Sequence, residues 1–377
     1  MPWLWSRLKL LDWWIMVSVV ILMALSVIML WSMSAADGSS ADLALSGRFL
    51  RQLAFCLVTL AMILGGTLFL DVRTLERVSS PLYIISLVLL VWVLVGGEVI
   101  RGTRGWLVLG PINIQPVEFA KLGFVLFFAT TLKRWARHLK ELRALFVSAL
   151  SVALIGGLVL LQPDFGSFFV FLAVWLAMIA TVGLKKSHAV VMVLLTIASG
   201  VLAWYLFAPY QRDRLKEFLT PNRDPQGRGY QLRQSMIAVG SGGITGRGLG
   251  LGSQSQLRFL PERQTDFLFA VIAEELGFIG VGFILLLWGT ILVRLLYWAR
   301  VVTDDFALFT MLGITLLMTI QVTMVIGMNI GLLPITGLAL PLMSYGGSSM
   351  ISTGLLLMVA QCIAVQSTRS GWGKKYQ

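Results

Sequence analysis

Ten stretches of the 377-residue chain are apolar enough and long enough to cross a lipid bilayer. A transmembrane helix needs about 17 to 25 predominantly apolar residues, and after each stretch the chain returns to charged or turn-forming residues. The predicted spans are residues 11–34, 50–70, 80–97, 117–132, 144–162, 165–183, 188–207, 266–293, 305–328 and 342–366. This pattern predicts an all-α polytopic membrane protein with ten transmembrane helices, organised as a single membrane domain over residues 1–377.

Basic residues set the orientation of the spans, because cytoplasmic segments carry an excess of Lys and Arg. With the N-terminus inside, the cytoplasmic connections contain basic clusters such as those in residues 133–143 and 369–375. The short outer connections hold few basic residues, namely Arg48, Arg51, Arg101 and Arg104. Both termini are therefore predicted to be cytoplasmic, and the longest connection, residues 208–265 between the seventh and eighth spans, is predicted to be extracytoplasmic.

Composition agrees with this class of protein and excludes others. Hydrophobic residues make up 57% of the chain and charged residues only 13%, against about 25% charged residues in soluble domains. The net charge of +12 is explained by the insertion pattern, so no nucleic-acid partner is predicted. Cys56 and Cys362 both lie within spans, which argues against a disulfide framework or a cysteine metal site.

Two outer segments hold most of the chain outside the predicted membrane, residues 98–116 and 208–265. In the second, YQRDRLKEFL is typical of an amphipathic interfacial helix, and YQLRQSMIAVG predicts a second short helix. The glycine-rich stretch SGGITGRGLGLGSQSQ follows, and it satisfies neither of the common nucleotide-binding glycine motifs. Its backbone amides, with Arg247 and Arg258 nearby, are instead suited to cradling an anionic headgroup.

Candidate chemistry lies on the outer side, where this topology leaves no His or Cys and so excludes Ser-His-Asp and Cys-His arrangements. Glu118 and Lys121 share one helical face at the outer end of the fourth span. Asp164 lies in the turn between the fifth and sixth spans, and Asp266 begins the eighth. Ionisable groups at membrane depth are expensive and usually mark a site. The competing interpretation is structural, with Asp266 or Thr265 serving only as a helix cap.

Glu274 and Glu275 lie two to three turns further into the eighth span. Pairing with other spans or with Arg and Lys explains them as well as catalysis does, so the sequence assigns them no role.

Several long strings resemble, in order and spacing, the signatures of the SEDS family (shape, elongation, division and sporulation). They are GTRGWLVLG, QPVEFAKL, QPDFGS, DPQGRGYQLRQSMIAVGSGGITGRGLGLGSQSQLRFLPERQTDFLFAVIAEELGFIG and MNIGLLPITGLALPLMSYGGSS. The DP-G-GYQ string and the LPER start are more similar to the rod-shape, elongation members than to the division members. One departure is Gln264, where the family usually has histidine before TD.

The resemblance implies a peptidoglycan glycosyltransferase that polymerises lipid II with inversion and releases undecaprenyl pyrophosphate. Asp266 matches the family's essential aspartate, and a positioned carboxylate that accepts the acceptor hydroxyl's proton suits this reaction. Glu118, Lys121 and Asp164 fall in the other polar signatures. The charge of the leaving pyrophosphate would be neutralised by Lys121, Arg101, Arg104 or a divalent cation such as Mg²⁺ or Mn²⁺; the sequence requires no other cofactor.

The resemblance also implies partners and a location. These are lipid II, the nascent glycan strand, membrane lipids and a class B penicillin-binding protein, on the extracytoplasmic face of the bacterial cytoplasmic membrane. Two other functions remain open at this point, because ten spans with intramembrane carboxylates also suit a flippase for the lipid-linked precursor, and a non-catalytic scaffold for wall synthesis would carry the same spans.

Overall fold

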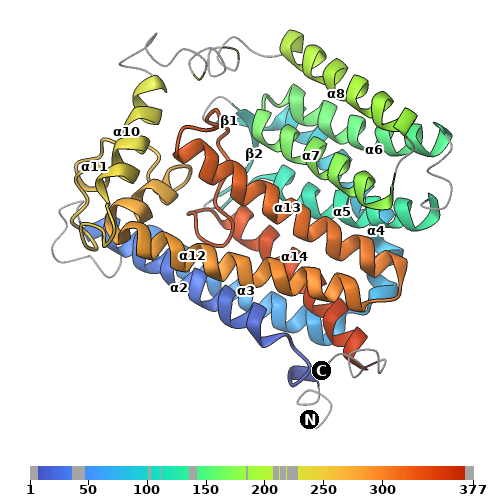
Figure 1. Ribbon diagram of the computed structural model, residues 1–377, viewed down its shortest axis with the longest axis horizontal. Coiled ribbons are helices and arrows are strands. Elements are labelled where there is room, and N and C mark those ends of the chain that lie inside the picture. The colour runs from blue at the N-terminus through green and yellow to red at the C-terminus, as the bar shows by residue number, and fades with distance from the viewer. Residues whose placement is uncertain are drawn as a thin grey trace.

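Long helices lying side by side in one bundle make up most of the structure, a computed structural model (Figure 1). It describes residues 7–35, 47–100, 103–110, 112–135, 142–183, 186–206, 212, 218 and 228–369. Among these, ten helices have 18 residues or more, and each coincides with one predicted span. They are α2 (Trp13–Ala35), α3 (Gly47–Phe69), α4 (Val72–Gly96), α5 (Pro116–Trp135), α6 (Leu142–Leu161), α7 (Phe165–Val182), α8 (Lys186–Leu206), α12 (Leu268–Val301), α13 (Asp305–Asn329) and α14 (Gly347–Arg369).

Seven of these helices are long and apolar enough to cross a membrane, which makes the chain a multi-pass membrane protein. Helices α6 and α8 contribute shorter apolar stretches, Leu145–Leu161 and Val190–Val201. Helix α5 carries Glu118 and Lys121 near its start and Lys133 and Arg134 in its last turn, so its composition alone does not identify it as a span. The count of ten spans and the cytoplasmic termini therefore stay predictions.

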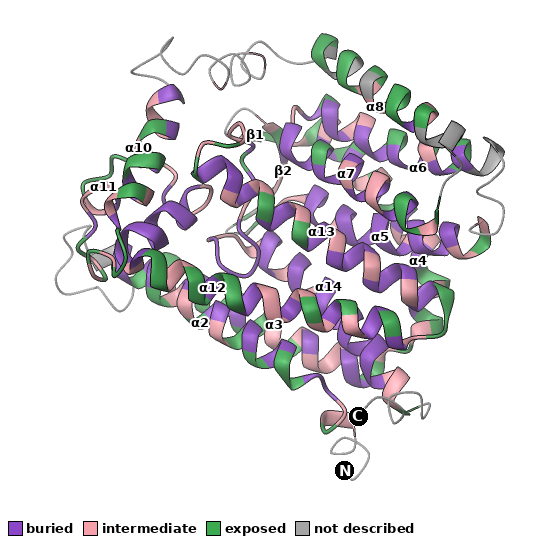
Figure 2. Ribbon diagram, in the orientation of Figure 1, coloured by how far each residue is buried: buried purple, intermediate pink, exposed green. Residues whose placement is uncertain are grey.

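Burial divides the bundle into central and peripheral helices (Figure 2). Helices α5 and α14 are buried around most of their circumference, and aromatic side chains fill the space beside α5, where Phe124 packs edge-on against Phe171 with ring centroids 5.4 Å apart. Peripheral helices such as α4 instead present exposed apolar residues along one side. Such residues are suited to contact with lipid, because lipid tails are as apolar as they are.

A small sheet in the first outer segment corrects the prediction that the protein is all-α. Strands β1 (Glu98–Ile100), β2 (Thr103–Leu109) and β3 (Ile112–Ile114) form an antiparallel sheet in the order β1-β2-β3. Ile100 faces Thr103 and Leu109 faces Ile112 across the two turns. Gly110, with φ of +63°, begins the second turn in a conformation that glycine adopts without steric cost. The β-branched residues of this segment favour strands.

The second outer segment contains α10 (Arg228–Ser241) and α11 (Ser253–Gln256). Helix α10 confirms the short helix expected from YQLRQSMIAVG. The amphipathic helix predicted from YQRDRLKEFL lies outside the described residues, apart from Arg212 and Phe218.

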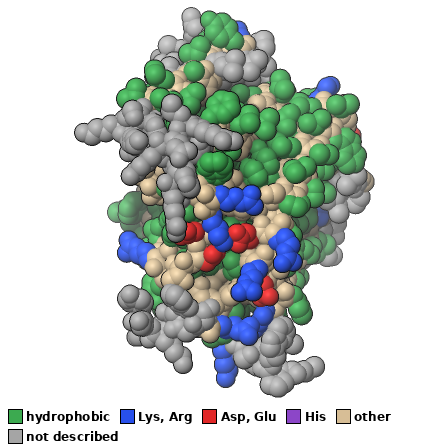
Figure 3. All heavy atoms as spheres, turned by 90° about the vertical axis from the view of Figure 1, so that its right-hand side faces the viewer, with side chains coloured by type: hydrophobic (Ala, Val, Ile, Leu, Met, Phe, Trp, Pro, Cys, Tyr) green, Lys and Arg blue, Asp and Glu red, His purple; other side chains and the backbone are tan. Residues whose placement is uncertain are grey.

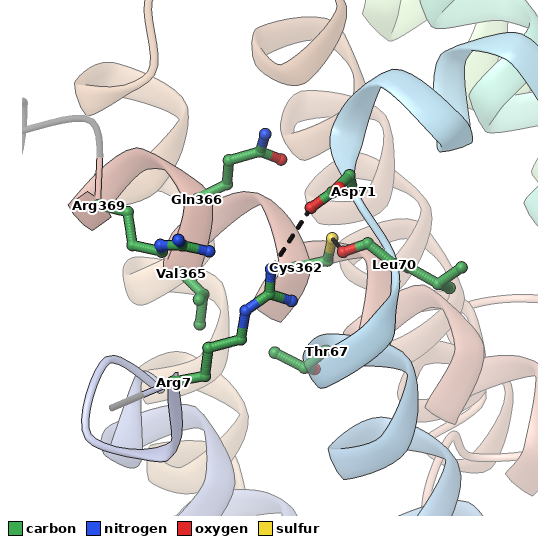
Figure 4. A pocket seen from close by; sticks show the side chains of 8 residues that line it. All are labelled: Arg7, Thr67, Leu70, Asp71, Cys362, Val365, Gln366 and Arg369. Carbon is green, nitrogen blue, oxygen red and sulfur yellow. Dashed lines mark hydrogen bonds and ion pairs between the residues drawn. The ribbon is translucent and has the colours of Figure 1, made fainter. Parts of the chain in front are cut away.

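At the end of the bundle near the two termini, charged side chains connect the helices. Lys133 of α5 bonds Glu76 of α4 at 2.9 Å and Asp304 of the α12–α13 connection at 3.0 Å. Figure 3 shows basic and acidic side chains gathered on this side of the molecule, with hydrophobic side chains around them. A neighbouring cavity of about 330 Å³ contains an ion pair between Arg7 and Asp71, whose side-chain atoms lie 3.7 Å apart (Figure 4).

Asp12 provides a buried connection at the same end. Its Oδ2 accepts hydrogen bonds from Arg294 Nε at 2.7 Å and from Trp298 Nε1 at 2.6 Å, both on α12. Its backbone amide donates to Gln361 Oε1 of α14 at 3.0 Å, and its carbonyl accepts from Gln361 Nε2 at 2.9 Å. Because Asp12 directly precedes α2, it fastens the ends of α2, α12 and α14 together.

Candidate active site

Glu118 and Lys121 form a buried ion pair at the start of α5. Lys121 Nζ donates to Glu118 Oε1 at 2.6 Å, and the two side chains are only 1% and 7% exposed. Lys121 Nζ also donates to Gln321 Oε1 of α13 at 3.3 Å, while Ser352 Oγ of α14 donates to Glu118 Oε2 at 3.1 Å. Buried charges persist only when such additional hydrogen bonds offset the loss of water. The predicted pair is thus held by polar groups from two other helices.

Asp164 caps the N-terminus of α7. Its carboxylate accepts hydrogen bonds from the Ser167 backbone amide at 3.0 Å and from Ser167 Oγ at 2.8 Å, as a helix cap should. Burial raises the pKa of the Asp164 carboxyl, while the bonds from Ser167 and the positive charge of Lys121 act in the opposite direction. Asp164 therefore has a structural role and also lies within electrostatic reach of the α5 pair.

Asp266 lies in a turn just before α12, and it is half-buried. The N-cap position of α12 is occupied by Phe267, so neither Thr265 nor Asp266 holds the cap position that the structural interpretation gave them. Asn329 Nδ2 at the end of α13 donates to the Asp266 carbonyl oxygen at 3.0 Å. This bond fixes the backbone from which the Asp266 carboxylate extends.

One short segment, residues 336–340, connects these groups. A Cβ atom built on Gly337 would lie 3.7 Å from Asp266 Oδ2, and one built on Gly166, two residues after Asp164, would lie 2.7 Å from the Thr336 carbonyl oxygen. On the same segment the Ala339 carbonyl oxygen accepts a hydrogen bond of 3.1 Å from Gln321 Nε2, and Gln321 in turn holds Lys121. Residues from three predicted motifs therefore lie around a stretch of the fourth, Gly166 and Asp266 directly and Lys121 through Gln321.

The two predicted arginines are not part of this cluster. Arg104 lies in β2 opposite Val99, with an exposed side chain, and among the described residues it makes no contact with the α5 pair. Arg101 lies outside the described residues. Their roles as pyrophosphate ligands stay predictions.

Sequence reasoning missed three polar residues that hold the site in place: Gln321, Asn329 and Ser352. Each is buried within a helix that is apolar enough to be a candidate span. Uncharged polar residues inside a predicted span are a usable signal, because a buried amide or hydroxyl without a partner costs free energy. Attention to charged residues alone passed over them.

Glu274 and Glu275 are fully buried and attach the outer segment to α12. Glu274 accepts hydrogen bonds from the backbone amides of Gln254 and Ser255, in the first turn of α11, at 2.8 and 3.0 Å. Glu275 accepts from Ser32 Oγ at 2.7 Å and Gln256 Nε2 at 3.0 Å. Of the two roles left open by the sequence, these contacts favour the structural one, with serine, glutamine and backbone groups as partners.

A break in α12 makes this attachment possible. Gly277 has φ of +64°, a left-handed conformation within the helix, so the carbonyl groups before it lose their partners within the helix. The Glu274 and Glu275 carbonyl oxygens instead accept from the amides of Arg247 and Gly248, each at 3.0 Å. The expectation that these glycine-rich amides cradle a headgroup is therefore wrong at Arg247 and Gly248, because α12 already occupies them.

Comparison with known proteins identifies the family. The sequence pattern of the cell cycle proteins FtsW, RodA and SpoVE matches residues 12–369, nearly the whole chain. The chain belongs to the FtsW, RodA and SpoVE family. Among its relatives, the stage V sporulation protein E of Bacillus subtilis is 37% identical over 93% of this chain and 97% of its own length. The peptidoglycan glycosyltransferase MrdB of Escherichia coli K12 is 35% identical, with 92% and 91% covered.

Solved structures of the FtsW, RodA and SpoVE family have the same fold as this chain. The rod shape determining protein RodA of Thermus thermophilus is 30% identical and superposes with a TM-score of 0.67, covering 94% of this chain and 96% of that one. A chain from a structure titled as a peptidoglycan synthase complex that coordinates polymerization and crosslinking is 37% identical, with a TM-score of 0.74 and 93% and 97% covered. A probable FtsW of Coxiella burnetii is 34% identical, with 94% and 96% covered. The relatives named FtsW, MrdB and stage V sporulation protein E are thus similar to this chain to nearly the same degree.

Proposed function

We propose that this protein is a peptidoglycan glycosyltransferase that polymerises lipid II into glycan strands, inverting the sugar's anomeric centre and releasing undecaprenyl pyrophosphate. The observation that carries the proposal is the convergence of the Lys121–Glu118 pair and Asp266 on residues 336–340, in a chain whose relatives include named peptidoglycan glycosyltransferases. The proposed role in elongation rests on the DP-G-GYQ and LPER strings, because overall identity does not separate the named relatives.

Asp266 is the proposed base. A sugar hydroxyl is a weak nucleophile, so a carboxylate that accepts its proton as the bond to the anomeric carbon forms lowers the barrier. The hydrogen bond from Asn329 to its backbone and the neighbouring Gly337 support this role, since they hold the carboxylate at the edge of the 336–340 segment without filling the space beside it with a side chain.

Lys121 is the proposed partner of the leaving group. As the anomeric C–O bond breaks, negative charge gathers on the pyrophosphate, and a cation in a water-poor site stabilises that charge. Glu118 holds the ammonium group in place, and its own charge moderates the attraction. Arg101, Arg104 or a divalent ion would add further positive charge. Among the described residues no group of three or more His, Cys, Asp and Glu gathers, so such an ion would take ligands from the substrate as well.

The proposal includes the ten-span topology, with both termini in the cytoplasm and the site on the extracytoplasmic face of the bacterial cytoplasmic membrane. It also includes a class B penicillin-binding protein as partner. A similar chain in a structure titled as a polymerization and crosslinking complex supports such a pairing.

Purified protein incubated with lipid II in detergent tests the activity. Wild type is expected to produce glycan strands, and Asp266→Asn is expected to produce none while melting at the wild-type temperature. Addition of a chelator tests the divalent cation. A flippase or a scaffold would give no strands in this assay, because detergent removes the two sides of the membrane without removing chemistry.

A further inference from the structure

We propose that a cavity beside the Asp266 turn, on the outer end of α3, binds the pyrophosphate of a second lipid-linked sugar, the acceptor. This rests on the proposed function. When two lipid II molecules are joined, the acceptor's 4-oxygen bonds to the donor's anomeric carbon, its proton passes to Asp266, and the donor's pyrophosphate leaves with the bonding electrons. Both molecules carry a pyrophosphate, so one cationic site at Lys121 is not enough.

The cavity has a volume of about 510 Å³ and lies against the turn that ends at Asp266, within the size range of small-ligand sites. Three arginines line it, Arg48, Arg258 and Arg263, against one carboxylate, Glu262. Glu262 accepts a hydrogen bond of 3.1 Å from Thr265 Oγ1. The excess of guanidinium groups, which suit phosphate oxygens geometrically, selects an anion.

The three arginines have different roles. Arg263 is buried and donates to the carbonyl oxygens of Ser255 and Met33, so it supports the cavity wall and contributes charge. Arg48 and Arg258 have exposed side chains that a ligand can reach. Arg258 also has φ of +59°, a left-handed conformation that costs a non-glycine residue free energy and tends to occur at functional sites.

Gln264 connects the cavity to the base. Its side-chain oxygen accepts a hydrogen bond of 3.3 Å from Arg48, and its carbonyl oxygen accepts one of 2.9 Å from the amide of Tyr345. Because the Gln264 side chain is a neutral amide, this bond orients the Arg48 guanidinium without cancelling its charge. A phosphate held by Arg48 therefore lies beside the turn that carries Asp266, two residues further on.

The test compares Arg48→Gln, Arg258→Gln and the double variant with Arg51→Gln, a matched control. Arg51 is also exposed and lies one turn further along α3, but it does not line the cavity. Direct binding is measured with farnesyl pyrophosphate and with inorganic pyrophosphate on detergent-purified protein, and polymerisation is measured over a range of lipid II concentrations. Tryptophan-fluorescence melts check that each variant is folded.

Each arginine variant is expected to weaken farnesyl pyrophosphate binding and to raise the KM for lipid II about tenfold, as the loss of one charge-assisted hydrogen bond implies, with a smaller change in kcat. Arg51→Gln should match wild type. Unchanged binding and KM in a folded double variant would overturn the proposal, and so would equally tight binding of inorganic pyrophosphate, since a lipid tail would then contribute nothing. The binding arm needs no turnover, so it stands even if wild type makes no glycan.

Discussion

Removal of the Glu274 carboxylate should release the glycine-rich stretch from α12. In Glu274→Ala the backbone amides of Gln254 and Ser255 lose the oxygens to which they now donate at 2.8 and 3.0 Å. A buried donor left without a partner costs about 1 to 3 kcal/mol, so the two together cost about 2 to 6 kcal/mol. Because Gln254 is only partly buried, water can replace part of its bond, and the lower half of that range is expected.

This cost should appear locally rather than across the whole bundle. The attached segment has its own hydrogen bonds to α12, from Arg247 and Gly248, and local opening needs less free energy than global unfolding. Hydrogen–deuterium exchange should therefore accelerate in residues 246–256 and stay unchanged in α14. Glu274→Gln, which keeps one acceptor oxygen, should give an intermediate effect.

A matched control comes from the same helix. Thr290 is partly exposed on α12 and its hydroxyl donates to the Leu286 carbonyl oxygen at 2.9 Å, so Thr290→Ala should leave exchange and glycan synthesis at wild-type levels. Glycan synthesis by Glu274→Ala should fall, because the released segment leads directly to Asp266. Wild-type exchange rates at residues 246–256 in the alanine variant would refute the assignment of Glu274 as the attachment point.

Two further substitutions probe the opposite ends of the bundle. Lys121→Ala leaves Glu118 buried without its cation, and breaking a buried pair in this way costs roughly 3 to 5 kcal/mol. We therefore expect a lower melting temperature and a loss of polymerisation. The double variant Lys121→Ala with Glu118→Gln should recover the melting temperature but not the activity. Recovery of both would contradict the role of Lys121 at the leaving group. Asp12→Ala removes the carboxylate that accepts hydrogen bonds from Arg294 and Trp298. A thermal scan should show a lower melting temperature, while polymerisation per folded molecule stays at the wild-type level. A loss of activity without a lower melting temperature would show that this end takes part in the reaction.

Hydrophobic patterning predicted the long helices well because each had only to be long and apolar, a local property that lipid imposes on every span. The same reasoning missed the break at Gly277, because the partners that stabilise it, Arg247 and Gly248, lie about thirty positions earlier in the chain. It missed the sheet of residues 98–114 for a different reason, since short outer strands carry no membrane signal. Pairing with a distant segment decides the break in α12, whereas the strands of the sheet pair with their immediate neighbours in the chain.

The candidate site shows the same division. Charge within apolar sequence singled out Glu118, Lys121 and Asp266, and motif order linked them to one family. The sequence could not show that residues 336–340 bring them together, because that segment contains no charged side chain and contributes through backbone carbonyl groups and a glycine. Nor could the sequence decide whether Asp164 is a helix cap or an electrostatic neighbour of Lys121, because in the structure Asp164 is both.

The arrangement of buried polar groups also bears on the choice between a polymerase and a flippase. A carrier of the alternating-access type must part its helices at both ends in turn. If that opening parted α2 from α12 and α14 at the end near the termini, it would break the bonds of the Asp12 carboxylate to Arg294 and Trp298 and of its backbone to Gln361, and each opening would have to offset the loss of these bonds. Polymerisation as proposed makes no such demand, because the proposed base, the leaving-group cation and the acceptor cavity all lie at the end that carries Asp266. The buried bonds of Asp12 therefore oppose the opening that a flippase needs at this end of the bundle. They are compatible with an enzyme that keeps this end closed and works at the opposite one.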